Sequence, residues 1–199
     1  MPPILFYFDF SSPYGYLASL RIDEIAGRHQ RDVEWKPILL GPIFKTSGSS
    51  PLTSQPLKGR YALHDFVRSA RWNAAPFHMP NAFPIATHQA ARAYYWLHDT
   101  DPDKAKRLAK RLFEAYFTNG KDISSAEAVI AEARSLDAKA ESLGAALTDP
   151  AIKERLKAEV ENAISLGVCG SPYIIVDGEP FWGADRLDQV EAWIRTGGW

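Results

Sequence analysis

The sequence predicts an α/β fold that carries a large, all-helical insertion. Three observations lead to this prediction. A strand, a helix and a second strand are predicted over residues 4–36, and two strands followed by a helix are predicted at the end of the chain. The long segment between these two units shows loop and helix patterns. Because a strand–helix–strand unit joins parallel strands through a right-handed crossover, we expect the first unit to form part of an open sheet.

The first unit begins with a strongly apolar run. Residues 4–10 are almost continuously apolar or aromatic, which is typical of a strand that is covered on both faces. Ser12 is a favourable N-cap, and Pro13 suits the first helical position because it has no N–H group to leave unpaired. Apolar residues at helical spacing follow. Residues 33–36 then alternate apolar and charged side chains, which predicts a second strand.

The middle of the chain is predicted to be a loop followed by helices. Residues 41–60 are rich in glycine, proline, serine and threonine, so we predict a loop there. The apolar spacing and the capping residues predict helices over 61–72, over 85–97, from Asp101-Pro102 to about residue 119, after the capping pattern of residues 124–127, and from Asp149-Pro150 to Gly167.

The end of the chain returns to strands. Residues 173–176 are β-branched or aromatic, and Asp177-Gly178 predicts a tight hairpin turn. Phe181 and Trp182 begin the return strand, and Asp185 is predicted to cap a final helix. This order of elements is the thioredoxin plan with a helical domain inserted. We therefore predict a discontinuous thioredoxin-like domain (residues 1–40 and 167–199) and a helical insertion domain (residues 41–166).

Composition excludes several classes of protein. The 199 residues carry a formal net charge of −1, so nothing favours binding to nucleic acid or to an anionic membrane. No apolar run approaches the length of a membrane span, and the first residues lack the pattern of a secretory signal. Cys169 is the only cysteine, which excludes an internal disulfide and fits a reducing, cytoplasmic location. The five histidines show no metal-ligand spacing, so no metal is expected.

Three short segments are candidates for chemistry. Ser11 follows the first strand, at the edge of an open sheet where ligands bind and beside a helix N-terminus. The alternative is that both serines only cap the helix, although one capping serine is enough. Ser171-Pro172 precedes the third strand, and in the thioredoxin plan this peptide bond is cis and faces the first helix. Asp185 stands at another predicted helix start, where it can bind an ammonium group.

Motifs along nearly the whole chain resemble one family. They comprise residues 8–14 (FDFSSPY), Phe44-Lys45 before Ser47-Gly48, residues 58–61 (KGRY), Phe83-Pro84, residues 167–172 (GVCGSP) and residues 181–187 (FWGADRL). In this order and spacing they resemble the 2-hydroxychromene-2-carboxylate isomerases of the kappa-class glutathione transferase group. The resemblance implies a thioredoxin fold with a helical insertion, glutathione as the cofactor and a homodimer.

The resemblance also implies roles for particular residues. Ser11 is expected to hydrogen-bond the glutathione sulfur and to favour its thiolate. The remaining glutathione contacts are expected from Lys45, Ser49, Val168, Ser171, Pro172, Ala184 and Asp185. Among these, Ser171 is expected to bind the cysteinyl backbone, and Ala184 and Asp185 are expected to hold the γ-glutamyl end. Lys45 and the loop after it are expected to close over the tripeptide.

Three positions depart from the family pattern. Ser49 and Ala86 stand where the family often has asparagine, and Gly15 stands where it often has serine. Ser49 implies a weaker glutathione contact, and Ala86 implies a reshaped pocket for the aromatic acid.

The resulting hypothesis is a glutathione-dependent isomerase that converts 2-hydroxychromene-2-carboxylate into trans-o-hydroxybenzylidenepyruvate during breakdown of naphthalene-type aromatic compounds. Two alternatives stay open: a kappa-like transferase that conjugates glutathione to electrophiles, and a non-catalytic thioredoxin-fold binding module. A dithiol oxidoreductase is nearly excluded, because a second cysteine is needed to resolve a mixed disulfide.

Overall fold

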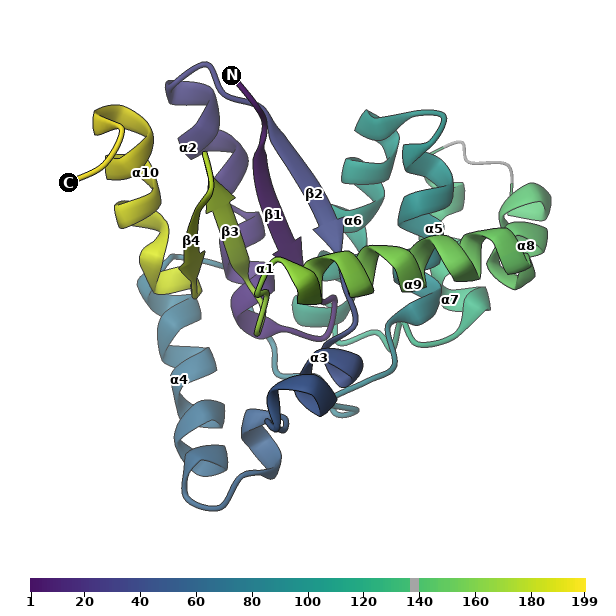
Figure 1. Cartoon of the computed structure of the whole chain (residues 1–199). Coiled ribbons are helices and arrows are strands. Elements are labelled where there is room, and N and C mark those ends of the chain that lie inside the picture. Colours follow the sequence, from purple (N-terminus) through teal and green to yellow (C-terminus); the bar gives the residue numbers. More distant parts are fainter. Residues whose placement is uncertain (137–139) are drawn as a thin grey trace.

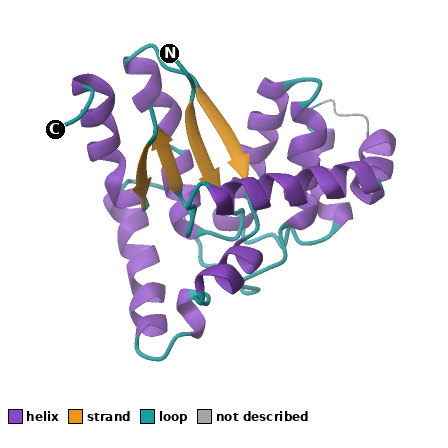
Figure 2. Cartoon of the chain, in the orientation of Figure 1, coloured by secondary structure: helices purple, strands orange, loops and turns teal. Residues whose placement is uncertain are grey.

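The four strands form one mixed sheet in the order β2-β1-β3-β4 (Figure 2). The structure is a computed structural model and describes residues 1–136 and 140–199. Strands β1 (Ile4–Phe8) and β2 (Val33–Pro37) run parallel, whereas β3 (Tyr173–Val176) and β4 (Glu179–Trp182) are antiparallel to their neighbours. The carboxyl ends of β1, β2 and β4 therefore meet the start of β3 at one edge of the sheet.

Helices surround the sheet on several sides (Figure 1). Helices α5 to α8 gather beyond the β2 edge, whereas α4 extends away on the other side, below α10. The helices are α1 (Pro13–Ser19), α2 (Ile22–Arg28), α3 (Leu40–Ser47), α4 (Lys58–Trp72), α5 (His88–His98), α6 (Pro102–Phe117), α7 (Ala126–Arg134), α8 (Ala140–Thr148), α9 (Pro150–Ser165) and α10 (Leu187–Thr196). Two short 3₁₀ turns, η1 (Leu52–Ser54) and η2 (Ala184–Arg186), precede α4 and α10.

The hairpin turn and four of the predicted helix caps are confirmed, whereas the cap predicted at Asp185 is wrong. The side chains of Ser12, Asp101, Ser125 and Asp149 each accept a hydrogen bond from a backbone amide in the first turn of α1, α6, α7 and α9. In the hairpin turn, Asp177 and Gly178 have φ angles of +51° and +92°, as a type I′ turn requires. Local sequence chemistry is therefore enough to place these element boundaries.

Two element predictions are wrong. The loop predicted over residues 41–60 contains α3, because Pro42 lies in the first turn, where proline is tolerated, and Gly48 ends the helix with φ +68°. The helical spacing after Pro13 predicts one helix before the second strand, but the structure has two, α1 and α2. The first ends where the Ser19 hydroxyl donates to the Tyr16 carbonyl (2.6 Å) and competes with the helical hydrogen bonds. Helix α8 was not predicted, and residues 137–139 before it lie outside the described part of the chain.

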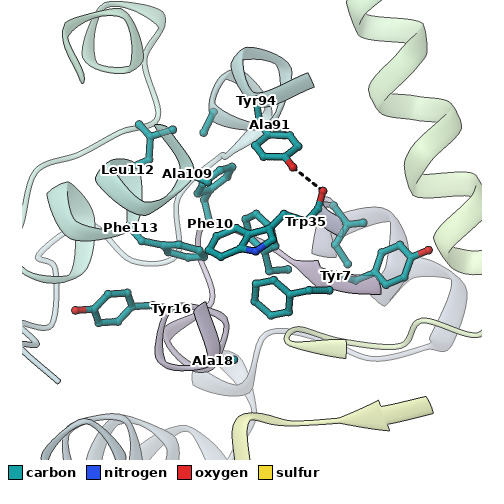
Figure 3. Packing of buried hydrophobic residues seen from close by; sticks show 14 of the residues in the cluster. Tyr7, Phe10, Tyr16, Ala18, Trp35, Ala91, Tyr94, Ala109, Leu112 and Phe113 are labelled. Carbon is teal, nitrogen blue, oxygen red and sulfur yellow. Dashed lines mark hydrogen bonds between the residues drawn. The ribbon is translucent and has the colours of Figure 1, made fainter. Parts of the chain in front are cut away.

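One hydrophobic core joins the sheet to the inserted helices (Figure 3). The ring of Phe113 on α6 lies 5.2 Å from that of Phe10, centroid to centroid. The consecutive residues Tyr94 and Tyr95 on α5 both point toward β2: their hydroxyls donate to the carbonyls of Trp35 (2.8 Å) and Pro37 (2.9 Å). These two side chains therefore pack between the inserted helices and the sheet. The division into two domains stays a prediction.

Among the helices of residues 1–136 and 140–199, none combines the length and the apolar character that crossing a membrane requires.

Candidate functional site

An open cleft of about 1610 Å³ lies at the sheet edge where β1 ends and β3 begins. Its walls are the start of α1, helix α3 with the loop after it, one face of α4, and the segments around Ser171 and Asp185. Pockets for small ligands usually measure about 300–1000 Å³. This cleft therefore has room for a peptide-sized ligand together with a second small molecule.

Six of the eight residues predicted for the site line this cleft: Ser11, Lys45, Ser49, Ser171, Ala184 and Asp185. The other two lie behind its surface. Pro172 is buried, and its carbonyl accepts the amide of Gly183 (3.0 Å). The Val168 side chain is only 3% exposed, and its amide donates to the Ala163 carbonyl at the end of α9. Its side chain therefore belongs to the core and takes no part in the lining of the cleft.

Ser12 joins two walls of the cleft. Its hydroxyl accepts a hydrogen bond from the Gly15 amide (3.0 Å), as predicted for a capping residue, and donates to the Ser171 carbonyl (3.0 Å). The second bond is formed across 159 residues of chain. Ser12 is therefore more than a cap, because it places the start of α1 directly against the loop that precedes β3.

Ser11 lies on the other side of the same turn. Its amide donates to the Asp9 carboxylate (2.8 Å), and its hydroxyl oxygen accepts the Ile85 amide (3.1 Å). Because the oxygen already accepts the Ile85 hydrogen, the hydroxyl proton of Ser11 can be donated to another group. The Ile85 amide is presented by the turn at Phe83–Pro84, whose peptide bond is cis.

The Ser171–Pro172 peptide bond is cis, as predicted. The Ser171 hydroxyl accepts the Asp9 amide (3.0 Å), and a Cβ atom at position 15 would lie only 2.8 Å from this hydroxyl oxygen. The glycine at position 15, where the family often has serine, is thus explained by the close approach of Ser171. The Ser171 amide donates no hydrogen bond to any residue that the structure describes, so it is left for a ligand.

Asp185 does not cap the final helix. It lies in the short turn η2, and α10 begins two residues later with Arg186 at the N-cap and no side-chain cap. The turn at Gly183 (φ +117°) directs the chain this way and brings the Asp185 carboxylate over its own backbone. The Asp185 side chain is 74% exposed, and Arg186 lies 3.4 Å from it. Its carboxylate is therefore accessible at the cleft wall.

Helix α4 contributes a wall of the cleft that was not predicted from the sequence. One face of this helix lines the cleft with Lys58, Tyr61, Asp65, Ser69 and Trp72. These residues recur every three or four positions, which is the periodicity of a single helix face. The sequence could therefore have predicted that these polar and aromatic side chains lie on one face of a helix.

Asp65 is a charged residue on this face of α4 whose carboxylate is fixed by several hydrogen bonds. It accepts hydrogen bonds from the hydroxyls of Tyr14 and Ser69 and from the Arg68 guanidinium. Burial alone would raise the pKa of Asp65, but these donors outweigh it and hold the pKa below its ordinary value. The α4 wall therefore presents a carboxylate that stays ionised at neutral pH.

Cys169 also lines the cleft, as a half-buried side chain. Burial raises the pKa of its thiol, which favours the protonated, unreactive form. Within residues 1–136 and 140–199 no group of three or more histidine, cysteine, aspartate or glutamate side chains is placed to hold a metal ion.

The sheet order, the helical insertion and the cis-proline loop facing the start of α1 define a protein of the thioredoxin fold. The chain belongs to the family of the DSBA-like thioredoxin domain, whose model matches residues 3–195.

Two curated relatives are similar over almost their whole length. The 2-hydroxychromene-2-carboxylate isomerase of Sphingobium xenophagum is 26% identical over 95% of this chain and 96% of its own. Human glutathione S-transferase kappa 1 is 26% identical over 92% of this chain and 86% of its own. Among solved structures, a selenomethionine 2-hydroxychromene-2-carboxylate isomerase superposes with a TM-score of 0.86 at 24% identity, and the match covers 96% of this chain and 93% of that one. This likeness supports the fold.

Proposed function

We propose that the chain binds glutathione in the cleft and uses it as a catalytic thiol to isomerise a conjugated, aromatic-derived acid. The observation that carries this proposal is the junction of the start of α1 with the cis-proline loop, where the Ser12 hydroxyl meets the Ser171 carbonyl (3.0 Å). A cysteinyl backbone paired with Ser171 would hold its sulfur beside the two serines. The substrate that fits the relatives is 2-hydroxychromene-2-carboxylate, opened to trans-o-hydroxybenzylidenepyruvate.

The polar groups of the cleft match the parts of the tripeptide. The amide of Ser171 and the second lone pair of its carbonyl pair with the cysteinyl unit. The γ-glutamyl end has an α-ammonium and an α-carboxylate, which suit the Asp185 carboxylate and the backbone at Ala184. The glycine carboxylate suits the exposed ammonium of Lys45 and the hydroxyl of Ser49 on the opposite wall.

The hydroxyl group of Ser11 makes the thiol reactive. A thiol with a pKa of about 8.5 is mostly protonated at neutral pH, and a hydrogen bond donated to sulfur favours the thiolate. Ser11 is the residue predicted for this contact, and its proton can be donated. Ser12 is less suited to this contact, because its single hydroxyl proton is already donated to the Ser171 carbonyl (3.0 Å) and its side chain is only 5% exposed. The geometry therefore favours Ser11 for the sulfur contact, with Ser12 holding the Ser171 backbone in place.

The chemistry needs no redox partner. Opening of the cyclic hemiketal first breaks the ring C–O bond: the hydroxyl proton passes to the phenolic oxygen, and the hemiketal carbon becomes the carbonyl of a conjugated α-keto acid. The thiolate adds to the double bond of this acid at the carbon beside the aromatic ring, and the electron pair of the double bond moves into the adjoining carbonyl as an enolate. Rotation about the resulting single bond changes the geometry. Collapse of the enolate then re-forms the double bond, breaks the C–S bond and returns the thiolate. Glutathione is recycled, which fits a chain with one cysteine and a cytoplasmic setting rich in glutathione.

Two measurements on the wild-type protein test this proposal. Calorimetric titration with glutathione should give one binding site per chain, and a ring-opening assay should depend on added glutathione. Over many turnovers the glutathione concentration should stay constant. Stoichiometric loss of glutathione would instead indicate a conjugating transferase, as the kappa-class relative suggests. Binding without turnover of any conjugated acid would indicate a binding module, and absence of binding would refute the proposal.

A further inference from the structure

Asp9 is a buried acidic residue at the end of β1 that the proposed chemistry does not use. Its side chain is only 4% exposed. One carboxylate oxygen accepts the Ser11 amide and the Thr87 hydroxyl (both 2.8 Å), and the other accepts the Leu40 amide (2.8 Å). One carboxylate therefore contacts the turn before α1, the start of α3 and the start of α5.

The backbone of Asp9 extends the same set of contacts. Its amide donates to the Ser171 hydroxyl (3.0 Å), and its carbonyl accepts the Ser12 amide (2.9 Å). Through its side chain and backbone, Asp9 thus touches both serines and the cis-proline loop. The proposed glutathione site requires these segments to keep fixed positions relative to one another.

The carboxylate supplies a cap that local sequence lacks. The N-cap residues of α3 and α5, Leu39 and Thr87, form no side-chain cap of their own. The Leu40 amide, the first of α3, is satisfied by Asp9 instead. Since α3 carries Lys45 and Ser49 leads on from it, the position of both depends on a residue that lies 31 positions earlier in the chain.

Stability alone does not account for a carboxylate here. Burial raises the pKa of Asp9, and the hydrogen bonds from Ser11, Leu40 and Thr87 only partly offset it. No arginine or lysine of the described residues forms an ion pair with it. Burying a carboxylate without a counter-charge lowers the free energy of unfolding. The carboxylate is nevertheless suited to this position, because all three groups that contact it are hydrogen-bond donors and need an acceptor.

We propose that Asp9 is a positioning residue of this cleft, which sets α3 with Lys45 and Ser49 against Ser11, Ser12 and Ser171. This rests on the proposed glutathione function for its effect on binding and rate. Asp9 acts through these neighbours and contacts no substrate.

The variant Asp9→Asn keeps the shape of the side chain but replaces one acceptor oxygen with an NH₂ group that faces a donor. We expect glutathione to bind at least about ten-fold more weakly, and turnover at saturating glutathione to fall as well. The reason is that the Asp9 carboxylate would no longer hold α3 and the two serines in fixed positions. Thr87→Val, which removes one donor and leaves the carboxylate, should show a smaller loss of the same kind. If Asp9→Asn does not fold, Thr87→Val with several-fold weaker binding carries the test.

Asp23→Asn is the matched control. Asp23 is also a partly buried carboxylate that accepts several hydrogen bonds, from Trp35 and Lys106 among others, but it lies outside the cleft lining. It should lower stability and leave glutathione affinity and turnover unchanged. If Asp9→Asn binds glutathione and turns over like the wild type, or if Asp23→Asn matches its losses, the positioning role is overturned while the proposed function stands.

Amide hydrogen exchange in the free protein tests the positioning role of Asp9 independently of the proposed glutathione function. The amides of Ser11 and Leu40 should exchange faster in Asp9→Asn and stay protected in Asp23→Asn. If the wild type does not bind glutathione, the proposed function is wrong, and exchange alone decides whether Asp9 holds these segments. Unchanged protection at both amides would overturn the inference whatever the binding result.

Discussion

At the scale of single residues, the two neighbouring serines differ in their partners, and this allows their roles to be separated. Removing the hydroxyl that contacts the sulfur deletes a hydrogen bond to a charged group, which contributes roughly 1.5–3 kcal/mol, or about a ten- to hundred-fold loss of rate. We expect Ser11→Ala to show this loss, since the Ser11 oxygen accepts the Ile85 amide (3.1 Å) and its proton can be donated to sulfur. Ser12→Ala should show a smaller loss, since the Ser12 proton is donated to the Ser171 carbonyl (3.0 Å).

The pH–rate profile and the melting curve complete this test. The lost rate should be partly recovered at higher pH, where more of the thiol ionises unaided. Ser12→Ala should also lose about 1 kcal/mol of stability because Ser12 caps α1, whereas Ser11→Ala should keep its stability. If Ser12→Ala shows the larger, pH-dependent loss, the sulfur contact belongs to Ser12. Wild-type rates in both variants would end the thiolate hypothesis.

Asp185→Ala should weaken glutathione binding and leave turnover at saturating glutathione nearly unchanged. Asp185 would contact the remote γ-glutamyl end, so its contribution is equal in the ground state and the transition state. Because its side chain is 74% exposed, an ion pair there contributes about 0.2–1 kcal/mol, or up to roughly a five-fold rise in Kd. Glu161→Ala, an exposed carboxylate on α9, is the control. A fall in saturated turnover with an unchanged Kd would contradict this role.

Contacts between residues close in the sequence could be predicted, whereas contacts between residues far apart in the sequence could not. The capping role of Ser12 could be predicted because its partner lies three positions away. Its bond to Ser171 could not, nor could the contact of Asp9 with Leu40, because their partners become neighbours only in the folded chain. The family resemblance supplied Ser171 and Asp185, but no local pattern distinguishes Val168 as a core residue.

At the scale of elements, a charged cluster joins α2, β2 and α6. The Asp23 carboxylate accepts hydrogen bonds from Trp35 Nε1 and Lys106 Nζ (3.0 Å each), and Lys110 Nζ lies 2.7 Å away. Burial alone would raise the pKa of Asp23, but the two ammonium groups and the indole hold it below its ordinary value of 3.8.

This lowered pKa gives the cluster a defined pH dependence. The unfolded chain takes up the proton first as pH falls, so the stabilisation is present above about pH 4 and is lost as pH falls through the folded pKa. Asp23→Asn should lower the free energy of unfolding by roughly 1–3 kcal/mol at neutral pH, and the gap to the wild type should narrow as the pH falls below about 4. Urea unfolding across this range measures it, with the exposed Asp32→Asn as control. A gap that stays constant with pH would contradict this account.

The elements differ in how far their own sequence defines them. Helices α6, α7 and α9 carry local caps and were predicted near their true starts. Helix α3 was not predicted, because Gly41, Pro42 and Gly48 are residues typical of loops. Its first amide is capped by Asp9, which lies outside the helix and far away in the sequence. The site face of α4 was present in the sequence as a stripe from Lys58 to Trp72, but only the fold shows that this stripe faces a cleft.

At the scale of the whole molecule, strand polarity explains why the predicted site came together. Tyr7 of β1 pairs with Tyr173 of β3, and Tyr173 pairs with Trp182 of β4. The chain therefore leaves β1, enters β3 and leaves β4 at one edge, with Ser11, Ser171 and Asp185 only a few residues beyond these pairs. A correct prediction of strand order was enough to bring these three segments together. The width of the cleft and its α4 wall depend on packing that the order of elements does not specify.

We expect two copies of the chain to associate through the outer face of α4. Leu63 and Val67, four residues apart on α4, are 43% and 39% exposed and do not line the cleft, so a second copy of the chain would bury apolar surface there. Light scattering at micromolar concentration should give twice the 22.2 kDa mass of one chain. Val67→Glu should shift the mass toward a single chain without loss of helical content, because a buried, unpaired charge opposes association. Leu166→Glu, at an equally exposed position (47%) beyond α9, should leave the dimer intact. A wild-type protein with the mass of one chain would contradict the dimer, and dissociation by Leu166→Glu alone would place the interface elsewhere.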